Sequence, residues 1–206
     1  MNISNVRFFF DPACPWTWIT SRWMVEVAEA RDIEVEWVIF SLRHRNRDNP
    51  DYDGFRAVLN AQHPAVRVLA AAGKLDGNEA VGRLYTALGS LIHHDGDDHL
   101  LRLTEAIEMA GLPADITEHA DNEAWDAGIV ETTEEGRAII GDDAGIPLII
   151  VPGNPAAFFG PVLSPAPTGA DATDLWDAFV SLGRFEGLYE VKRTRSTGPI
   201  FGPRPA

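Results

Sequence analysis

The feature that most constrains this chain is that its 206 residues include a single cysteine, Cys14. One thiol forms no internal disulfide, and it excludes zinc sites that are built from several cysteines. The fold must therefore be held by a buried apolar core, and a hydrophobic share of 45% is enough to build one. Cys14 itself is a buried inert thiol, a reactive thiol or an incidental surface residue, and its neighbours decide between these.

The charge of the chain excludes two classes of partner. Seventeen Lys and Arg residues stand against 31 Asp and Glu residues, which gives a formal net charge of −14. Nucleic acids and anionic membrane surfaces both attract positively charged proteins, so neither is expected as a partner. The longest apolar stretch, residues 144–151, is far shorter than a membrane-spanning helix, and the chain opens without the pattern of a signal peptide. We expect a cytoplasmic protein.

Apolar patterning predicts strands at the two ends of the chain. Residues 6–10 and 33–42 are rich in β-branched and aromatic side chains, and a helical pattern over residues 16–30 separates them. A strand–helix–strand unit of this length places its two strands parallel. Strand character returns at residues 147–151 and 157–163, which we pair as a hairpin, and it is followed by a last helix over residues 172–182.

The segment between these two regions is helical in pattern. Residues 81–92 carry a clear helical stripe of apolar side chains, and residues 100–107 carry another. Shorter helices are predicted on the two sides of His63–Pro64, over residues 55–59 and 65–72. The last two helices of this segment are predicted over residues 116–127 and 133–140.

This order of elements predicts an α/β fold, in which a four-stranded mixed sheet is flanked by helices and carries an inserted all-helical lobe. The predicted sheet domain comprises residues 1–42 and 144–190. The predicted lobe comprises residues 43–143, and residues 191–206 form an extended basic tail.

Cys14 lies where the first strand ends and the first helix begins. The first turn of a helix has unpaired N–H groups and a partial positive charge, both of which favour a thiolate over a thiol. Pro15 suits the first helical position, where no N–H is needed. These features predict a lowered pKa and a nucleophilic role for Cys14. The alternative is a cysteine that serves as a small hydrophobic residue.

Five segments give the chain a resemblance to a known family. They are FFFDPACPWTWITSRW at the start, LYTALG, GIPLIIVPG near residue 150, AAFFGPVLS, and KRTRSTGP in the tail. With Cys-Pro-Trp at the start of a helix and a distant Ile-Pro before a strand, the chain resembles the DsbA-like branch of the thioredoxin superfamily. Within that branch it is most similar to the mycothiol-dependent nitroreductases. The resemblance implies a thioredoxin-like fold with an inserted helical domain.

The resemblance also implies roles for particular residues. Cys14 would be the redox nucleophile, and Ile146–Pro147 would have a cis peptide bond that faces it. Dithiol members have a second cysteine where this chain has Thr17, and that cysteine resolves the mixed disulfide. The Thr17 hydroxyl can donate a hydrogen bond to the thiolate but cannot resolve a disulfide. A monothiol cycle is left, in which an external thiol both forms and releases the mixed disulfide.

Further pocket residues follow from the same resemblance. Trp16 is either a flat platform for an aromatic substrate or a packing residue. Asn46 and His94 match polar pocket positions in the family, and the alternative for each is a solvated loop residue. The predicted thiol- and substrate-binding set is Pro15, Trp16, Asn46, His94, Ile146 and Pro147.

Two other groups of polar residues raise the question of further ligands. Residues 93–99, with the sequence HHDGDDH, contain imidazoles and carboxylates, but their spacing matches no metal-binding pattern, so no metal is predicted. Arg43, Arg45 and Arg47 form a basic stretch on an acidic protein. They either contact an anionic thiol cofactor or form an ordinary surface.

The resulting prediction is a thiol-dependent oxidoreductase. It would use mycothiol as thiol co-substrate and reduce small electrophiles, nitroaromatic or quinone-like, through a mixed disulfide at Cys14. One alternative is a transferase or isomerase of the kappa glutathione transferase type, which adds the thiol to its substrate. Another is a non-catalytic thiol-binding module with an idle cysteine. The protein is expected to be a monomer or a homodimer.

Overall fold

The computed structural model describes residues 3–95, 102–153 and 157–205 and divides the chain into two compact units. The first unit comprises Met1–Phe10, Pro15–Val38 and Gly136–Gly202. The second comprises Asp11–Cys14, Ile39–Glu135 and Pro203–Ala206. The domain boundaries given by the sequence stay a prediction.

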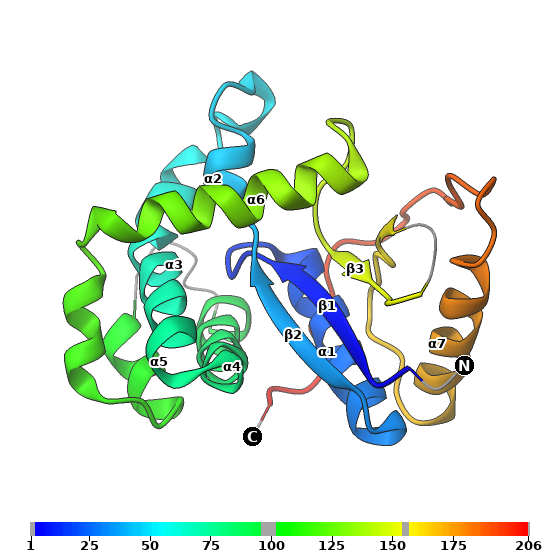
Figure 1. Ribbon diagram of the computed structural model, residues 1–206, viewed down its shortest axis with the longest axis horizontal. Coiled ribbons are helices and arrows are strands. Elements are labelled where there is room, and N and C mark those ends of the chain that lie inside the picture. Colours follow the sequence, from blue (N-terminus) through cyan, green and yellow to red (C-terminus); the bar gives the residue numbers. More distant parts are fainter. Residues whose placement is uncertain (1–2, 96–101, 154–156, 206) are drawn as a thin grey trace. The chain divides into compact units, whose positions relative to one another are not determined.

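The first unit is built on a mixed sheet of four strands in the order β2-β1-β3-β4 (Figure 1). The strands are β1 (Asn5–Phe10), β2 (Glu34–Ile39), β3 (Leu148–Ile150) and β4 (Phe158–Phe159). β3 is antiparallel to β1, with Phe8 opposite Ile149, and it is also antiparallel to β4. The hairpin and the four-stranded mixed sheet predicted from the sequence are therefore confirmed.

Two helices of the first unit, α1 (Pro15–Arg31) and α7 (Ala170–Leu182), pack against each other. The fully buried Trp23 of α1 donates a hydrogen bond from its indole nitrogen to the carbonyl of Ala172 at 2.9 Å. Its ring centroid lies 6.1 Å from that of Trp176. Thr20 of α1 donates to the carbonyl of Pro161 at 2.8 Å, which fixes the segment that follows β4. Both helices were predicted.

The second unit is helical. Its elements are α2 (Leu42–Arg45), the 3-10 turn η1 (Pro50–Tyr52), α3 (Arg56–Asp76), α4 (Asn78–His94), α5 (Leu103–Met109), the 3-10 turns η2 (Ala114–His119) and η3 (Glu123–Trp125), and α6 (Asp126–Ile140), whose last turn belongs to the first unit. α3 and α4 pack against each other (Figure 1). Leu69 of α3 and Leu84 and Leu88 of α4 are buried. The apolar stripes predicted for residues 81–92 and 100–107 lie on α4 and α5. No helix within the described ranges is both long enough and apolar enough to span a membrane.

The prediction of two short helices around His63–Pro64 was wrong. A single helix, α3, runs through Pro64. Proline in a helix interior removes one backbone donor and crowds the preceding turn. Here the burial of Val66 and Leu69 on the apolar side of α3 outweighs that cost, because tertiary packing routinely overrides local propensity.

Two element boundaries also differ from the prediction. The second strand ends at Ile39, and Leu42 begins the helix α2 instead of ending the strand. Residues 116–127 form no single helix, since η2 and η3 cover this region and α6 begins at Asp126. Asn122 accepts a hydrogen bond from the N–H of Ala124 at 3.0 Å, and such a side-chain cap favours a new start over a continuing helix.

A charged cluster fastens α3 to the start of α6. Arg67 binds the carboxylate of Asp126 through two hydrogen bonds of 2.7 Å, and Nε2 of the buried His63 lies 3.0 Å from the same carboxylate. The hydrogen bonds from Arg67 lower the pKa of Asp126 to about 2. Burial, together with the charge of Arg43, lowers the pKa of His63.

We expect Asp126→Asn to lower the free energy of unfolding at pH 7. The Asp126 side chain is 35% exposed, so solvent screening limits the loss to about 1 kcal/mol. The folded-state pKa of about 2 lies below the ordinary aspartate value of 3.8, so the carboxylate stabilises the fold above pH 4, and this contribution is lost as the pH falls toward 2. Urea unfolding of both proteins across this range measures the difference. Asp115→Asn, an exposed change in η2, is the control, and a difference independent of pH would contradict the assignment.

Candidate functional site

Cys14 lies in a four-residue loop, Asp11–Cys14, which joins β1 to α1 and belongs to the second unit. Cys14 is buried, with 7% of its surface exposed. Its N–H donates to the carbonyl of Asp11 at 3.0 Å, which closes the loop into a turn. α1 begins at Pro15, as the sequence predicted, so Cys14 immediately precedes the first helical residue.

The buried carboxylate of Asp11 anchors this loop. One oxygen, Oδ1, accepts a hydrogen bond from the N–H of Ala13 at 2.9 Å. The other, Oδ2, accepts one from the N–H of Leu42, the first residue of α2, at 2.7 Å. Burial raises the pKa of Asp11 to about 6, because desolvation outweighs the two backbone hydrogen bonds. Sequence reasoning missed this residue, although a carboxyl directly after an apolar strand is a signal for a buried acceptor.

His93, near the end of α4, holds the same loop from a second side. Its Nε2 lies 2.9 Å from the carbonyl oxygen of Pro12, and the side chain is buried. A carbonyl only accepts, so Nε2 carries the proton and donates. The sequence pointed to His94, which is half-buried at the last position of α4 and whose pocket role stays a prediction.

Asn46 caps the C-terminus of α2 and is buried. Its Nδ2 donates to the carbonyl of Leu42 at 3.0 Å, so the amide is fixed by the helix that Asp11 anchors. Asn46 lines a cavity of about 290 Å³ between α2 and α3. The residues that line it are Arg43, His44, Asn46, Arg47, Tyr52, Arg56, Leu59 and Asn60. The binding role of Asn46 stays a prediction.

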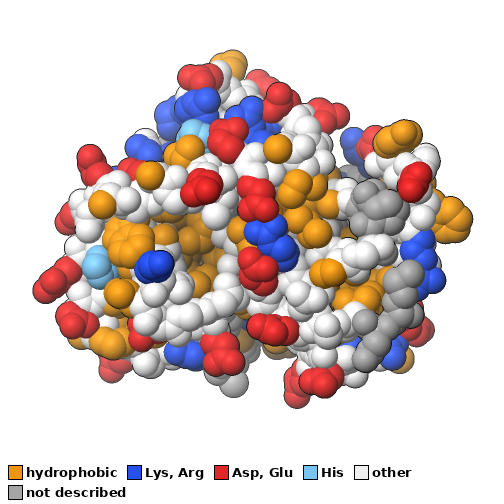
Figure 2. Space-filling view, in the orientation of Figure 1, with side chains coloured by type: hydrophobic (Ala, Val, Ile, Leu, Met, Phe, Trp, Pro, Cys, Tyr) orange, Lys and Arg blue, Asp and Glu red, His pale blue; other side chains and the backbone are white. Residues whose placement is uncertain are grey.

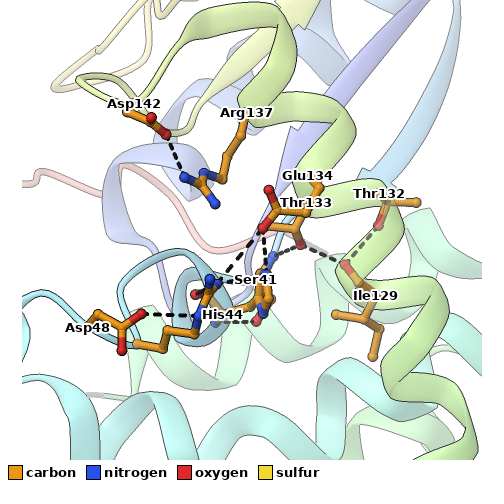
Figure 3. A network of polar contacts seen from close by, with 10 residues as sticks. Ser41, His44, Asp48, Ile129, Thr132, Thr133, Glu134, Arg137 and Asp142 are labelled. Carbon is orange, nitrogen blue, oxygen red and sulfur yellow. Dashed lines mark hydrogen bonds and ion pairs between the residues drawn. The ribbon is translucent and has the colours of Figure 1, made fainter.

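A polar network ties α2 to α6 within the second unit (Figure 3). The N–H of Ser41 donates to Oγ1 of Thr133 at 2.9 Å, and this hydroxyl donates in turn to the carbonyl of Ile129 at 2.6 Å. His44 Nε2 lies 2.6 Å from a carboxylate oxygen of Glu134. The network fixes the residue that precedes α2 and the first turn of that helix, and with them one wall of the cavity.

One predicted proline feature of the first unit is in place. The Ile146–Pro147 peptide bond is cis, as the sequence predicted, and both residues are buried. The carbonyl of Pro147 accepts a hydrogen bond from the N–H of Gly160 at 2.8 Å. Gly160 has a φ of 111°, a conformation that favours glycine. That Pro147 faces Cys14 stays a prediction.

Trp16 and Thr17 occupy the first turn of α1. Trp16 is half-buried, and the guanidinium carbon of Arg195, from the tail, lies 5.0 Å from the centroid of its ring. A cation over an indole face is attracted by the electrons of the ring. Thr17 is fully buried. Its predicted hydrogen bond to the thiolate stays a prediction, as does the platform role of Trp16.

The histidine-rich segment, residues 93–99, lies only partly within the described residues. Among residues 3–95, 102–153 and 157–205, no three His, Cys, Asp or Glu side chains are placed to hold a metal ion. Residues 96–101 lie outside the described ranges, so the prediction that residues 93–99 bind no metal is untested there.

We expect the stability that Asp11 contributes to depend on pH. Its folded-state pKa of about 6 lies above the ordinary aspartate value of 3.8, so folding favours the protonated acid and the contribution falls as the pH rises from 4 to 6. A shift of about two units corresponds to about 3 kcal/mol. The permanently neutral Asp11→Asn variant lacks this dependence. Urea unfolding of both proteins at pH 4 and pH 7 tests it, with Asp48→Asn as an exposed control. A constant difference between parent and Asp11→Asn would show that Asp11 titrates normally.

Comparison with solved structures identifies the fold. The cytosolic disulfide reductase DsbM from Pseudomonas aeruginosa, solved with GSH, is 16% identical with a TM-score of 0.58, and the match covers 86% of this chain and all of that one. A probable DsbA oxidoreductase from Streptomyces coelicolor is also 16% identical with a TM-score of 0.58, covering 93% of this chain and 94% of that one. These likenesses show a DsbA-like thioredoxin fold.

Comparison of sequences identifies the family. The uncharacterized protein Rv2286c of Mycobacterium tuberculosis is 26% identical over 218 residues, which cover 96% of this chain and 85% of that protein. The model of the Rv2466c-like family, described as mycothiol-dependent nitroreductase Rv2466c, matches residues 13–193. This match begins one residue before Cys14 and includes both Pro147 and the first part of the tail. The chain therefore belongs to the Rv2466c-like family of mycothiol-dependent nitroreductases.

Proposed function

We propose that this protein is a monothiol oxidoreductase that uses mycothiol to reduce small nitroaromatic or quinone-like electrophiles. The observation that carries the proposal is a lone cysteine at the residue before α1 in a member of this family. Its loop is held rigidly by Asp11 and His93, as expected of a nucleophile that must meet two successive reactants in one position. Thr17 stands where dithiol relatives have the resolving cysteine.

The chemistry of such a cycle balances with two thiols for each two-electron reduction. In the first half, the Cys14 thiol and one mycothiol form a mixed disulfide and give two electrons and two protons to the substrate. A quinone then becomes a hydroquinone, and a nitro group becomes a nitroso group with loss of water. In the second half, the thiolate of another mycothiol attacks the mixed disulfide, releasing mycothiol disulfide and restoring the Cys14 thiolate.

The predicted site residues divide this work. Cys14 is the catalytic thiol, and the Thr17 hydroxyl stabilises its thiolate by a hydrogen bond. Pro15 starts the helix whose first turn favours that charge. Trp16 and Asn46 bind thiol or substrate.

The remaining members of the set are His94, Ile146 and Pro147. His94 binds thiol or substrate at the end of α4. The backbone around the cis bond between Ile146 and Pro147 offers polar groups to a bound thiol compound. Substitution of each residue in turn tests the role proposed for it.

Thiol stoichiometry tests the proposed reaction. Purified protein is given mycothiol and a quinone, and mycothiol disulfide and hydroquinone are both quantified. We expect one disulfide for each hydroquinone and no activity in Cys14→Ser, because an alcohol is hardly ionised at neutral pH. Loss of mycothiol without disulfide, with a thiol–substrate adduct instead, would mean thiol addition of the kappa glutathione transferase type. No turnover and no adduct would leave a non-catalytic module.

Substitution of Thr17 tests the monothiol step. After one equivalent of mycothiol disulfide, the intact mass of the parent should show a stable adduct on Cys14, because nothing inside the protein resolves it. Thr17→Cys should release the bound thiol and form an internal disulfide. Thr17→Val should keep the adduct and turn over more slowly by about tenfold or more, since a hydrogen bond to a charged group contributes about 1.5–3 kcal/mol. An adduct equally long-lived in Thr17→Cys would show that residue 17 does not face the sulfur.

A further inference from the structure

The cavity between α2 and α3 has a positive lining on a strongly acidic chain. Its eight lining residues include Arg43, Arg47 and Arg56 and no Asp or Glu, whereas the whole chain carries a formal charge of −14. Figure 2 shows basic side chains gathered over the α2 region at the top of the view, with acidic side chains beside them. The cavity and Cys14 belong to the same unit.

Two of the three arginines, Arg56 and Arg47, form ion pairs with carboxylates of the protein. Arg56 donates to the carbonyl of Arg47 at 2.8 Å and to the carboxylate of Asp53 at 2.7 Å, so it forms a fixed wall. Arg47 forms an ion pair of 3.2 Å with Asp48. Each of these cations therefore has a carboxylate that offsets its charge.

Arg43 differs from them because its hydrogen-bond partner is neutral. Its Nε donates to Oδ1 of Asn60 at 2.8 Å, and no carboxylate within the described part of the chain forms an ion pair with it. Its charge is felt inside the unit, where it lowers the pKa of His63. A guanidinium with an uncompensated charge at the edge of a cavity is suited to hold a carboxylate through its planar fork of N–H groups.

The loop of Cys14 and this cavity share one anchor. The carboxylate of Asp11 accepts the N–H of Leu42, and Arg43 is the next residue along α2. The polar network of Ser41 and His44 fixes the same turn. The position of Arg43 is therefore tied to that of the Cys14 loop through the backbone of α2.

We propose that this cavity binds the carboxylate of the electrophile that Cys14 reduces, with Arg43 as the residue that selects it. The proposal rests on the proposed reductase function and adds a substrate class, namely small aromatic electrophiles that bear a carboxylate. A volume of about 290 Å³ lies at the small end of ligand sites and suits such a molecule. The cavity does not contain the whole basic stretch of the sequence, because Arg45 does not line it. Its third arginine is Arg56, which lies outside that stretch.

Binding of a substrate fragment tests the cavity independently of catalysis. Isothermal titration calorimetry compares benzoate with benzamide, which has the same ring without the charge, and with inorganic phosphate. We expect the parent to bind benzoate and not benzamide. Arg43→Gln should lower the affinity for benzoate about tenfold or more, because it removes a charge-assisted hydrogen-bonded pair. Arg43→Lys, which keeps the charge and loses the fork, should fall between them. Lys74→Gln, an equal change of charge at the exposed end of α3, should bind benzoate like the parent.

Turnover then connects the cavity to Cys14. With mycothiol present, the parent should show a lower KM for 4-nitrobenzoate than for 4-nitrobenzamide, Arg43→Gln should lose this preference, and Lys74→Gln should keep it. Equal KM values in the parent, or benzoate binding that is unchanged in Arg43→Gln, would overturn the inference. Phosphate binding without benzoate binding would also overturn it. If neither nitro compound is reduced while benzoate binds through Arg43, the proposed function fails and the carboxylate site stands.

Discussion

The arrangement of the candidate site depends on the hydrogen bonds that the buried carboxylate of Asp11 accepts. This carboxylate accepts one hydrogen bond from an N–H of its own loop and one from the N–H of Leu42 at the start of α2, 31 positions from Asp11 in the sequence. With a pKa of about 6, it is mostly ionised at neutral pH although it is buried. The two backbone donors replace part of the hydration that the carboxylate loses on burial. The rest of the desolvation free energy lowers the stability of the fold, and in return the loop is held in place.

The loop also links the two units covalently. The chain leaves the sheet unit after Phe10, passes through the four residues of the loop, and returns at Pro15. Cys14 is thus held by hydrogen bonds of the helical unit, through Asp11 and His93, while the helix that follows it belongs to the sheet unit. Cys14 is therefore the last residue of a loop fixed by the helical unit, directly before the first helical residue of the next segment.

The sheet, α1, α4 and α7 could be predicted because each carries a local apolar pattern at its own period. The cis bond before Pro147 and the DsbA-like fold were predicted through the family resemblance, since local pattern alone gives neither. Three features were missed because they depend on partners remote in the sequence. α3 continues through Pro64 by virtue of tertiary packing, Leu42 begins a helix where its N–H meets Asp11, and His93 reaches the carbonyl of Pro12.

The arginines of the cavity also could not be told apart from the sequence. Their partners in the fold explain how a chain of net negative charge can bind a carboxylate. At physiological ionic strength, charges are screened beyond roughly 8 Å, so the distant carboxylates of this chain repel a small anion only weakly. What matters is the charge within the first few ångströms. An arginine already paired with a carboxylate must give up that partner, as Arg47 would, before it gains another. Arg43 has only the neutral amide of Asn60 to hold it, so it can accept a carboxylate without losing an ion pair. Sequence proximity groups Arg43 with Arg45 and Arg47, but only the fold brings Arg43 to the neutral amide of Asn60, 17 positions away.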